Sequence, residues 1–225
     1  GVKYYDYDGK EQPLMKILKD NGVNYIRLRI WNDPYNEKGE TYGGGDSTVD
    51  NGLKIGKEAT KYGMKVLVDF HYSDFWADPA KQTLPKAWQK DADNPDKMCE
   101  NIYSFTKDTL QKFKDAGVDV GMVQVGNEIT KGMCGYLEGD DNKSVWKNEN
   151  IYPILDRYIN AGSKAVREVT PDALIALHLE SLNRNVYSMI MDGWDKGNVD
   201  YDVLGTSYYP FWWNTPDALR NAQSL

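Results

Sequence analysis

An amide and a carboxylate stand side by side at Asn127 and Glu128, directly after the apolar run of residues 122–126. Such a run is typical of a buried parallel strand, and in α/β barrels the side chains just beyond the strand ends face the substrate. A glutamate in that place can give and take a proton, and the neighbouring amide can bind a hydroxyl group. Glu128 is therefore our first candidate for acid/base catalysis, although an ordinary polar loop also commonly carries Asn and Glu.

A denser group of polar and aromatic side chains occupies residues 69–76, at the end of the apolar run that begins at residue 64. His71 and Trp76 are its site candidates. A buried histidine is more often a satisfied core residue than a catalyst, so both interpretations of His71 stay open. Asp69, His71 and Asp74 would also suit a metal ion, but no second histidine stands at ligand spacing. We expect neither a metal nor a cofactor.

Two arginines share one face of the apolar run of residues 23–31, because side chains two apart on a strand point the same way. Arginines on a buried strand face are costly unless they are paired with carboxylates or directed into a site. Arg29 lies nearer the end of the run and is the stronger functional candidate. For Arg27, a structural ion pair is an equally good interpretation.

Aromatic residues are more abundant than a core requires, with 7 Trp and 16 Tyr. Partly exposed aromatic rings are good platforms for the flat apolar faces of sugars. Trp76 and Trp88 flank a proline-containing loop and are expected to line a cleft. Tyr209 and Trp212 follow the run that begins at residue 203, and His178 lies near the end of the run of residues 173–179.

The elements that must position these residues alternate between strand and helix. Apolar runs that begin near residues 23, 64, 118, 173 and 203 predict strands, and helical periodicity predicts helices at 11–21, 49–61, 95–116, 151–169, 189–194 and 216–225. This alternation predicts an α/β fold with a parallel sheet. No glycine-rich dinucleotide fingerprint follows any strand, and polar and aromatic residues collect at the strand ends, which favours a barrel over an open doubly wound sheet.

The number of strands predicts only part of such a barrel. A (β/α)8 TIM barrel needs eight strands, five are predicted here, and the first predicted helix has no strand before it. We therefore expect residues 1–225 to form a single-domain segment that covers roughly strands two to six, with the first and last strands missing.

Composition excludes several classes of function. A net charge of -7 without a basic stripe argues against a nucleic-acid partner. No apolar run is long enough to span a bilayer, and the first residues lack the apolar segment of a signal peptide. Cys99 and Cys134 form no CxxC motif, so we expect two thiols, with one disulfide as the alternative.

If Glu128 works on a polysaccharide, a second carboxyl group is needed. Glycosidases cleave the bond between two carboxyl groups, of which one protonates the leaving oxygen and the other attacks the anomeric carbon or activates water. Glu180 follows a strand but adjoins no polar cluster, and Asp69 lies within a strand rather than beyond its end. The second carboxylate is expected outside this chain.

Four motifs resemble the endo-β-1,4-galactanases of glycoside hydrolase family fifty-three. They are residues 22–34 (GVNYIRLRIWNDP), 69–79 (DFHYSDFWADP), 125–128 (VGNE) and 207–212 (SYYPFW). The resemblance covers nearly the whole chain, and the two longer motifs are specific. It implies a (β/α)8 barrel that hydrolyses β-1,4-galactan in pectin side chains (type I arabinogalactan) in endo fashion with retention of configuration.

The resemblance also implies residue roles. Glu128 matches the acid/base and Asn127 the amide that binds the sugar 2-hydroxyl. The residues expected to bind substrate are Arg29, Asp33, His71, Trp76, Trp88, Asn127, His178, Tyr209 and Trp212. The family's nucleophile follows the seventh strand, beyond Leu225, and a structural calcium would bind in the missing part. A secreted, monomeric protein is implied, with no membrane partner.

Two alternatives remain. One barrel fold hosts many substrates, so the protein could be a glycosidase of another polysaccharide specificity. The second is a non-catalytic carbohydrate-binding fragment, because the second carboxylate is missing.

Overall fold

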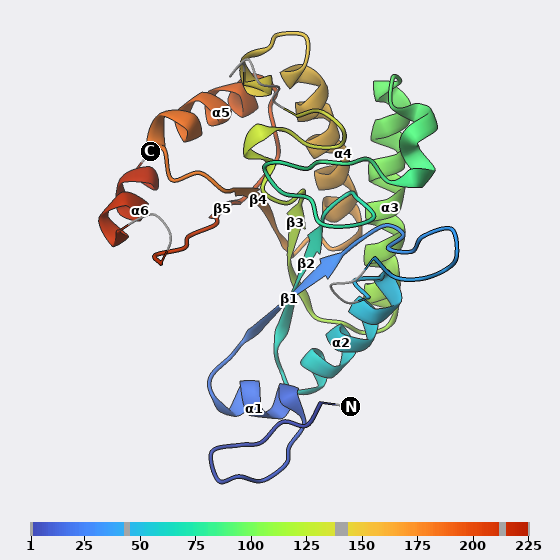
Figure 1. Cartoon of the computed structure of the whole chain (residues 1–225), viewed down its shortest axis with the longest axis vertical. Coiled ribbons are helices and arrows are strands. Elements are labelled where there is room, and N and C mark those ends of the chain that lie inside the picture. Colours follow the sequence, from blue (N-terminus) through green and yellow to red (C-terminus); the bar gives the residue numbers. More distant parts are fainter. Residues whose placement is uncertain (1, 43–45, 138–143, 212–214, 225) are drawn as a thin grey trace.

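A five-stranded parallel sheet runs through the computed structural model, which describes residues 2–42, 46–137, 144–211 and 215–224 (Figure 1). The strands are β1 (Tyr25–Ile30), β2 (Lys65–Phe70), β3 (Val120–Val125), β4 (Leu174–Leu179) and β5 (Val203–Thr206). All five lie where the apolar runs predicted them. Each predicted run extends beyond the hydrogen-bonded strand, because apolar residues continue into the turns that bury the strand ends.

The helices fill the intervals between the strands. They are α1 (Leu14–Asp20), α2 (Val49–Lys61), α3 (Pro95–Asp115), α4 (Tyr152–Val169), α5 (Arg184–Lys196) and α6 (Pro216–Ala222), with short 3-10 turns η1 (Lys86–Asp91), η2 (Ile129–Lys131) and η3 (Val145–Lys147). The prediction for α5 was too short. This helix begins after Asn183, whose side chain accepts a hydrogen bond from the backbone N–H of Asn185 and so caps the first turn.

The order of the strands identifies the architecture. Each strand pairs in parallel with the next one along the chain, in the order β1-β2-β3-β4-β5. A doubly wound sheet would reverse this order at a switch point and carry helices on both faces. Here α2, α3 and α4 lie together on one side of the strands (Figure 1). Consecutive β/α units of a barrel have this arrangement, as the sequence predicted.

Close packing of α4 holds the ends of β2 and β3 in place. At Gly162 of α4, a Cβ atom would lie 2.7 Å from the hydroxyl oxygen of Tyr72 and 2.8 Å from a methyl carbon of Val125. Both contacted side chains are fully or almost fully buried. Only glycine permits this approach, so α4 fixes the positions from which β2 and β3 deliver their polar residues.

Cys99 and Cys134 are both thiols, which confirms the expectation for the two cysteines. None of the helices in the described ranges has the length and apolar character needed to cross a bilayer.

A buried carboxyl group without a hydrogen-bond partner predicts a pH-dependent stability. Asp156 of α4 is 2% exposed, and neither of its oxygens is hydrogen-bonded to any described residue. Burial raises its pKa from 3.8 to about 7. The folded state therefore holds a proton that the unfolded state releases, so stability falls as the pH rises from about 4 to about 7. Asp156→Asn removes this dependence and should stabilise the protein by about 1–3 kcal/mol above pH 7.

Chemical denaturation at pH 5 and pH 8 measures the effect. The control is Asp172→Asn, which changes an exposed aspartate just after the same helix. The gain for Asp156→Asn should be larger at pH 8 than at pH 5, while the control should show no such difference. An equal gain at both pH values would contradict a buried proton on Asp156.

Candidate active site

A pocket of about 440 Å³ opens where the carboxyl ends of the strands converge. Its lining comes from all five strands or the segments directly after them: Arg27, His71, Trp76, Gln124, Asn127, Glu128, His178, Gly205, Thr206, Ser207, Tyr208 and Tyr209. Six of the residues proposed from sequence are thus brought together here, namely His71, Trp76, Asn127, Glu128, His178 and Tyr209.

Glu128 enters the pocket from a strained turn at the end of β3. Its backbone has φ 48°, in the left-handed region that non-glycine residues rarely adopt, and Gly126 before it has φ 81°. Such strain persists only where surrounding contacts hold it, and it gathers at functional sites. One holding contact is the side chain of Gln82, which donates a hydrogen bond to the carbonyl oxygen of Asn127 at 3.0 Å. The Glu128 carboxyl is 2.5 Å from the hydroxyl oxygen of Ser207.

The amide of Asn127 has a fixed orientation. Its Nδ2 donates to the carbonyl oxygen of Ala77 at 2.8 Å, and its Oδ1 accepts from Arg27 at 2.9 Å. The residue is only 5% exposed, so packing also restricts this side chain. Asn127 therefore presents a rigid polar edge beside Glu128.

An ion pair beneath the pocket supports this edge. Arg27 lies 2.9 Å from the carboxylate of Asp69, which is fully buried, and also donates to the side-chain oxygen of Gln124 at 3.0 Å. Gln124 and His71 contact the same carboxylate at 2.7 Å and 3.2 Å. The ion pair considered for Arg27 is confirmed, and Arg27 also lines the pocket.

Arg29 lies behind the pocket wall. Its guanidinium carbon is 3.8 Å from the ring centroid of Trp76, and its Nε donates to Ser47. Trp76 is 39% exposed and lines the pocket, whereas Arg29 does not. The structure therefore places Arg29 where it holds Trp76 through a cation–π contact, whereas Arg27 reaches the pocket itself.

Three other predicted residues are not part of the described pocket. Trp88 is 7% exposed and packs against Tyr72 and Phe105 in the core, so it does not line the cleft as expected. Its position at η1 turns the ring inward. Asp33 pairs with Lys86 at 3.0 Å on the adjoining loop. Trp212 lies outside the described residues.

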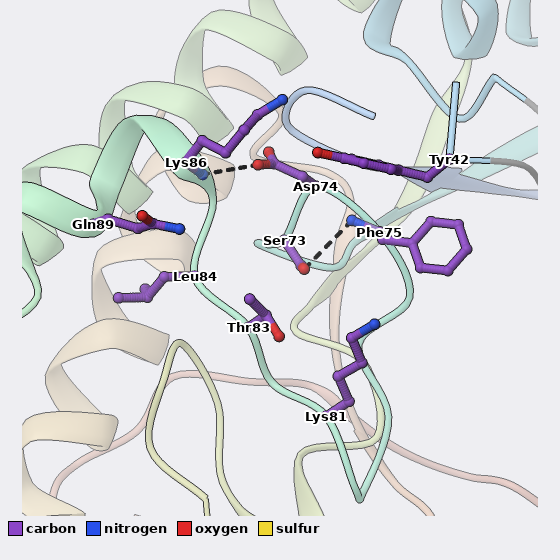
Figure 2. A pocket seen from close by; sticks show the side chains of 9 residues that line it. All are labelled: Tyr42, Ser73, Asp74, Phe75, Lys81, Thr83, Leu84, Lys86 and Gln89. Carbon is purple, nitrogen blue, oxygen red and sulfur yellow. Dashed lines mark hydrogen bonds between the residues drawn. The ribbon is translucent and has the colours of Figure 1, made fainter. Parts of the chain in front are cut away.

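A second hollow of about 390 Å³ is lined by residues of the loops that follow β1 and β2. Figure 2 shows its lining residues, from Tyr42 to Gln89. The Asp74 carboxylate accepts hydrogen bonds from the backbone N–H groups of Asp33 and Lys86, so it holds two loops together. The ammonium group of Lys81 lies 5.4 Å from the ring centroid of Phe75 and restricts access to that ring.

Among the polar residues that line the pocket, sequence reasoning did not single out Gln124 and Ser207. Gln124 interrupts an apolar run, and this polar residue inside a buried strand was the available signal. Ser207 begins the motif of residues 207–212, but a serine after an apolar run does not by itself indicate a site residue. Glu180, which the sequence analysis set aside for want of a polar cluster, does not line the pocket; burial, followed by the charge of Glu128, raises its pKa.

The arrangement can transfer one proton. Within the described residues, Glu128 is the only carboxylic acid that lines the pocket, with a fixed amide on one side and the indole of Trp76 as an apolar wall. Such a site can protonate or deprotonate an oxygen atom of a bound ligand.

Comparisons with known proteins agree on one family. The model of glycosyl hydrolase family 53 matches residues 1–224. The chain is 48% identical to an endo-β-1,4-galactanase of Bacillus subtilis (strain 168), over 100% of this chain and 48% of that protein. It is 33% identical to an arabinogalactan endo-β-1,4-galactanase of Humicola insolens, over 99% of this chain and 64% of that protein. The chain thus spans between about half and two thirds of the length of these relatives.

A solved structure shares the fold. The family 53 catalytic domain of Ignisphaera aggregans superposes with a TM-score of 0.89 at 39% identity, covering 99% of this chain and 59% of that domain. A family model over almost the whole chain and this superposition lead to the same conclusion: the chain belongs to glycosyl hydrolase family 53.

Proposed function

We propose that the protein containing this chain hydrolyses β-1,4-galactan in endo fashion with retention of configuration, and that Glu128 is its acid/base. The observation that carries the proposal is the Glu128 carboxyl beside the rigid Asn127 amide, in a pocket at the carboxyl ends of parallel strands. Two relatives are named as endo-β-1,4-galactanases, which supports this substrate.

We propose the following roles for the residues of the site. Glu128 protonates the glycosidic oxygen as the bond to the anomeric carbon breaks, and later removes a proton from the attacking water. Asn127 uses one hydrogen of Nδ2 for Ala77, so the second can bind a sugar hydroxyl. Trp76 offers its ring face to the apolar face of a sugar. A second carboxylate would come from sequence outside residues 1–225.

The test is the release of reducing ends from a panel of polysaccharides. We expect hydrolysis of β-1,4-galactan at a kcat/KM at least about 10²-fold above that on mannan or xylan, because hydroxyl-binding groups reject a wrongly oriented hydroxyl strongly. Preference for mannan or xylan would indicate the alternative specificity. Binding of galacto-oligosaccharides without turnover would indicate a carbohydrate-binding role.

The substrate suggests where the protein acts. A polymeric galactan does not enter cells, so we propose an extracellular, secreted protein. Acid/base hydrolysis by two carboxyl groups requires no cofactor.

A further inference from the structure

Four pocket residues form a continuous row of hydrogen bonds that ends at Glu128. Asn127 Oδ1 is 3.0 Å from His178 Nδ1, His178 Nε2 is 3.0 Å from Ser207 Oγ, and Ser207 Oγ is 2.5 Å from Glu128 Oε1. We call these residues the polar chain. Each bond needs one donor and one acceptor, so the protonation of one end restricts the other.

The Asn127 end of the polar chain is an acceptor. Its Nδ2 donates to Ala77 O and its Oδ1 accepts from Arg27, so the amide cannot be turned over without losing both bonds. His178 Nδ1 must therefore carry a hydrogen and donate it to Asn127 Oδ1.

The remaining neighbour of His178 Nδ1 does not change this assignment. Gln124 Nε2 is 3.4 Å away, but its two hydrogens point to Asp69 Oδ1 and Gly126 O, both at 2.7 Å. An unprotonated Nδ1 would thus face the Asn127 oxygen with no hydrogen between them. That arrangement is repulsive, because two acceptor lone pairs would face each other at 3.0 Å and His178 Nδ1 would have no good donor.

His178 carries only one proton at neutral pH. Burial, followed by the charge of Arg27, lowers its pKa to about 4. With the proton on Nδ1, Nε2 has a bare lone pair and accepts the hydroxyl hydrogen of Ser207.

We infer that the polar chain holds the acidic proton on Glu128. Ser207 has one hydroxyl hydrogen and donates it to His178 Nε2. In the short contact between Ser207 and Glu128, Glu128 must therefore be the donor. This inference rests on the proposed function, in which Glu128 must be protonated when the glycosidic bond breaks. Ser207 and His178 are then positioning residues that act through Glu128.

The protons balance over one cycle of the reaction. Glu128 gives its proton to the departing glycosidic oxygen and becomes a carboxylate. The Ser207 hydroxyl then turns from His178 Nε2 to Glu128 Oε1, which changes no covalent bond on serine or histidine. When Glu128 takes a proton from the attacking water, Ser207 turns back to His178 and the starting arrangement is restored.

The other charged groups near the polar chain leave its proton assignment unchanged. Glu180 directly after β4 is a further carboxyl group close to Glu128, and burial, followed by the charge of Glu128, raises the pKa of Glu180. Arg27 and Asp69 neutralise each other beneath the pocket. His71 accepts the backbone N–H of Ala77 at Nδ1 and donates from Nε2 to Asp69, so it is a neutral Nε2–H tautomer.

The two histidines of the chain therefore have opposite tautomers, and nitrogen NMR can test this directly. Protein labelled with ¹⁵N-histidine at neutral pH should show one Nε2–H ring for His71 and one Nδ1–H ring for His178. Loss of the second set of signals in His178→Gln gives the assignment. An Nε2–H ring or an imidazolium at His178 would overturn the inference. This result does not depend on hydrolysis of galactan, so it separates the inference from the proposed function.

The pH dependence of kcat/KM on galactan provides the second test. Ser207→Ala removes the acceptor of the Glu128 proton, so the alkaline limb should move to lower pH by about one unit, a loss of roughly 10-fold above that limb. Ser207→Thr keeps the hydroxyl and should keep the limb at the wild-type pH. A shift of Ser207→Ala to higher pH, or an equal loss at every pH, would overturn the inference.

Discussion

Glu128→Gln should lower kcat/KM on β-1,4-galactan by about 10²–10⁴-fold in the protein that contains this chain, the range expected for loss of a general acid. Glutamine occupies the same space but has no acidic proton. The leaving group is a sugar hydroxyl oxygen, which departs poorly as an alkoxide and must be protonated as the bond breaks. Assays of reducing ends on galactan measure this loss.

Two comparisons separate acid catalysis from disruption of the pocket. An aryl galactoside with an acidic phenol leaving group needs little protonation, so its bond-cleavage step should lose much less than that of galactan. The matched variant Glu180→Gln changes a nearby carboxyl group that does not line the pocket, and we expect less than about a 10-fold loss. An equal loss on both substrates would contradict the role of Glu128 as acid.

Arg27→Met should destabilise the folded protein by about 2–4 kcal/mol, because it leaves a buried carboxylate without its cation. Asp69 has no exposed surface, and Arg27 is the guanidinium that pairs with it. Methionine retains most of the apolar stem, so the loss reports on charge and hydrogen bonds. Arg27 also orients Asn127 and Gln124, so kcat/KM should fall as well.

Denaturant unfolding with Arg157→Met as the control measures this effect. Arg157 pairs with Asp96 on the surface, where both side chains are at least half exposed, and such pairs contribute about 0–1 kcal/mol. A similar small change for both variants would show that solvent, rather than Arg27, stabilises the Asp69 carboxylate.

Much of the fold is a local property of the chain. Buried parallel strands must be apolar on both faces, so β1 to β5 can be recognised in the sequence as apolar runs between amphipathic helices. Asn127 and Glu128 were found for the same reason, because the end of such a run is the place where a side chain reaches the pocket. The period of two also put Arg27 and Arg29 on one face correctly.

The local sequence pattern was insufficient where a residue's role depends on how deeply its side chain is buried and which distant residues it contacts. It ranked Arg29 above Arg27 from its place nearer the end of the run, whereas Arg27 is the one that lines the pocket and pairs with Asp69 of the neighbouring strand. It placed Trp88 in a cleft, since a tryptophan beside a loop has the same sequence signature whether its ring turns out or into the core.

Glu128 and the strand that carries it are thus encoded within a few residues, because burial and side-chain alternation act over that distance. Its hydrogen-bond partners are not. Ser207 lies 79 residues from Glu128 along the chain, and His178 lies 51 residues from Asn127. Only the folding of the parallel strands into one curved sheet brings these groups within 3 Å, and it is their mutual geometry that assigns the proton to Glu128.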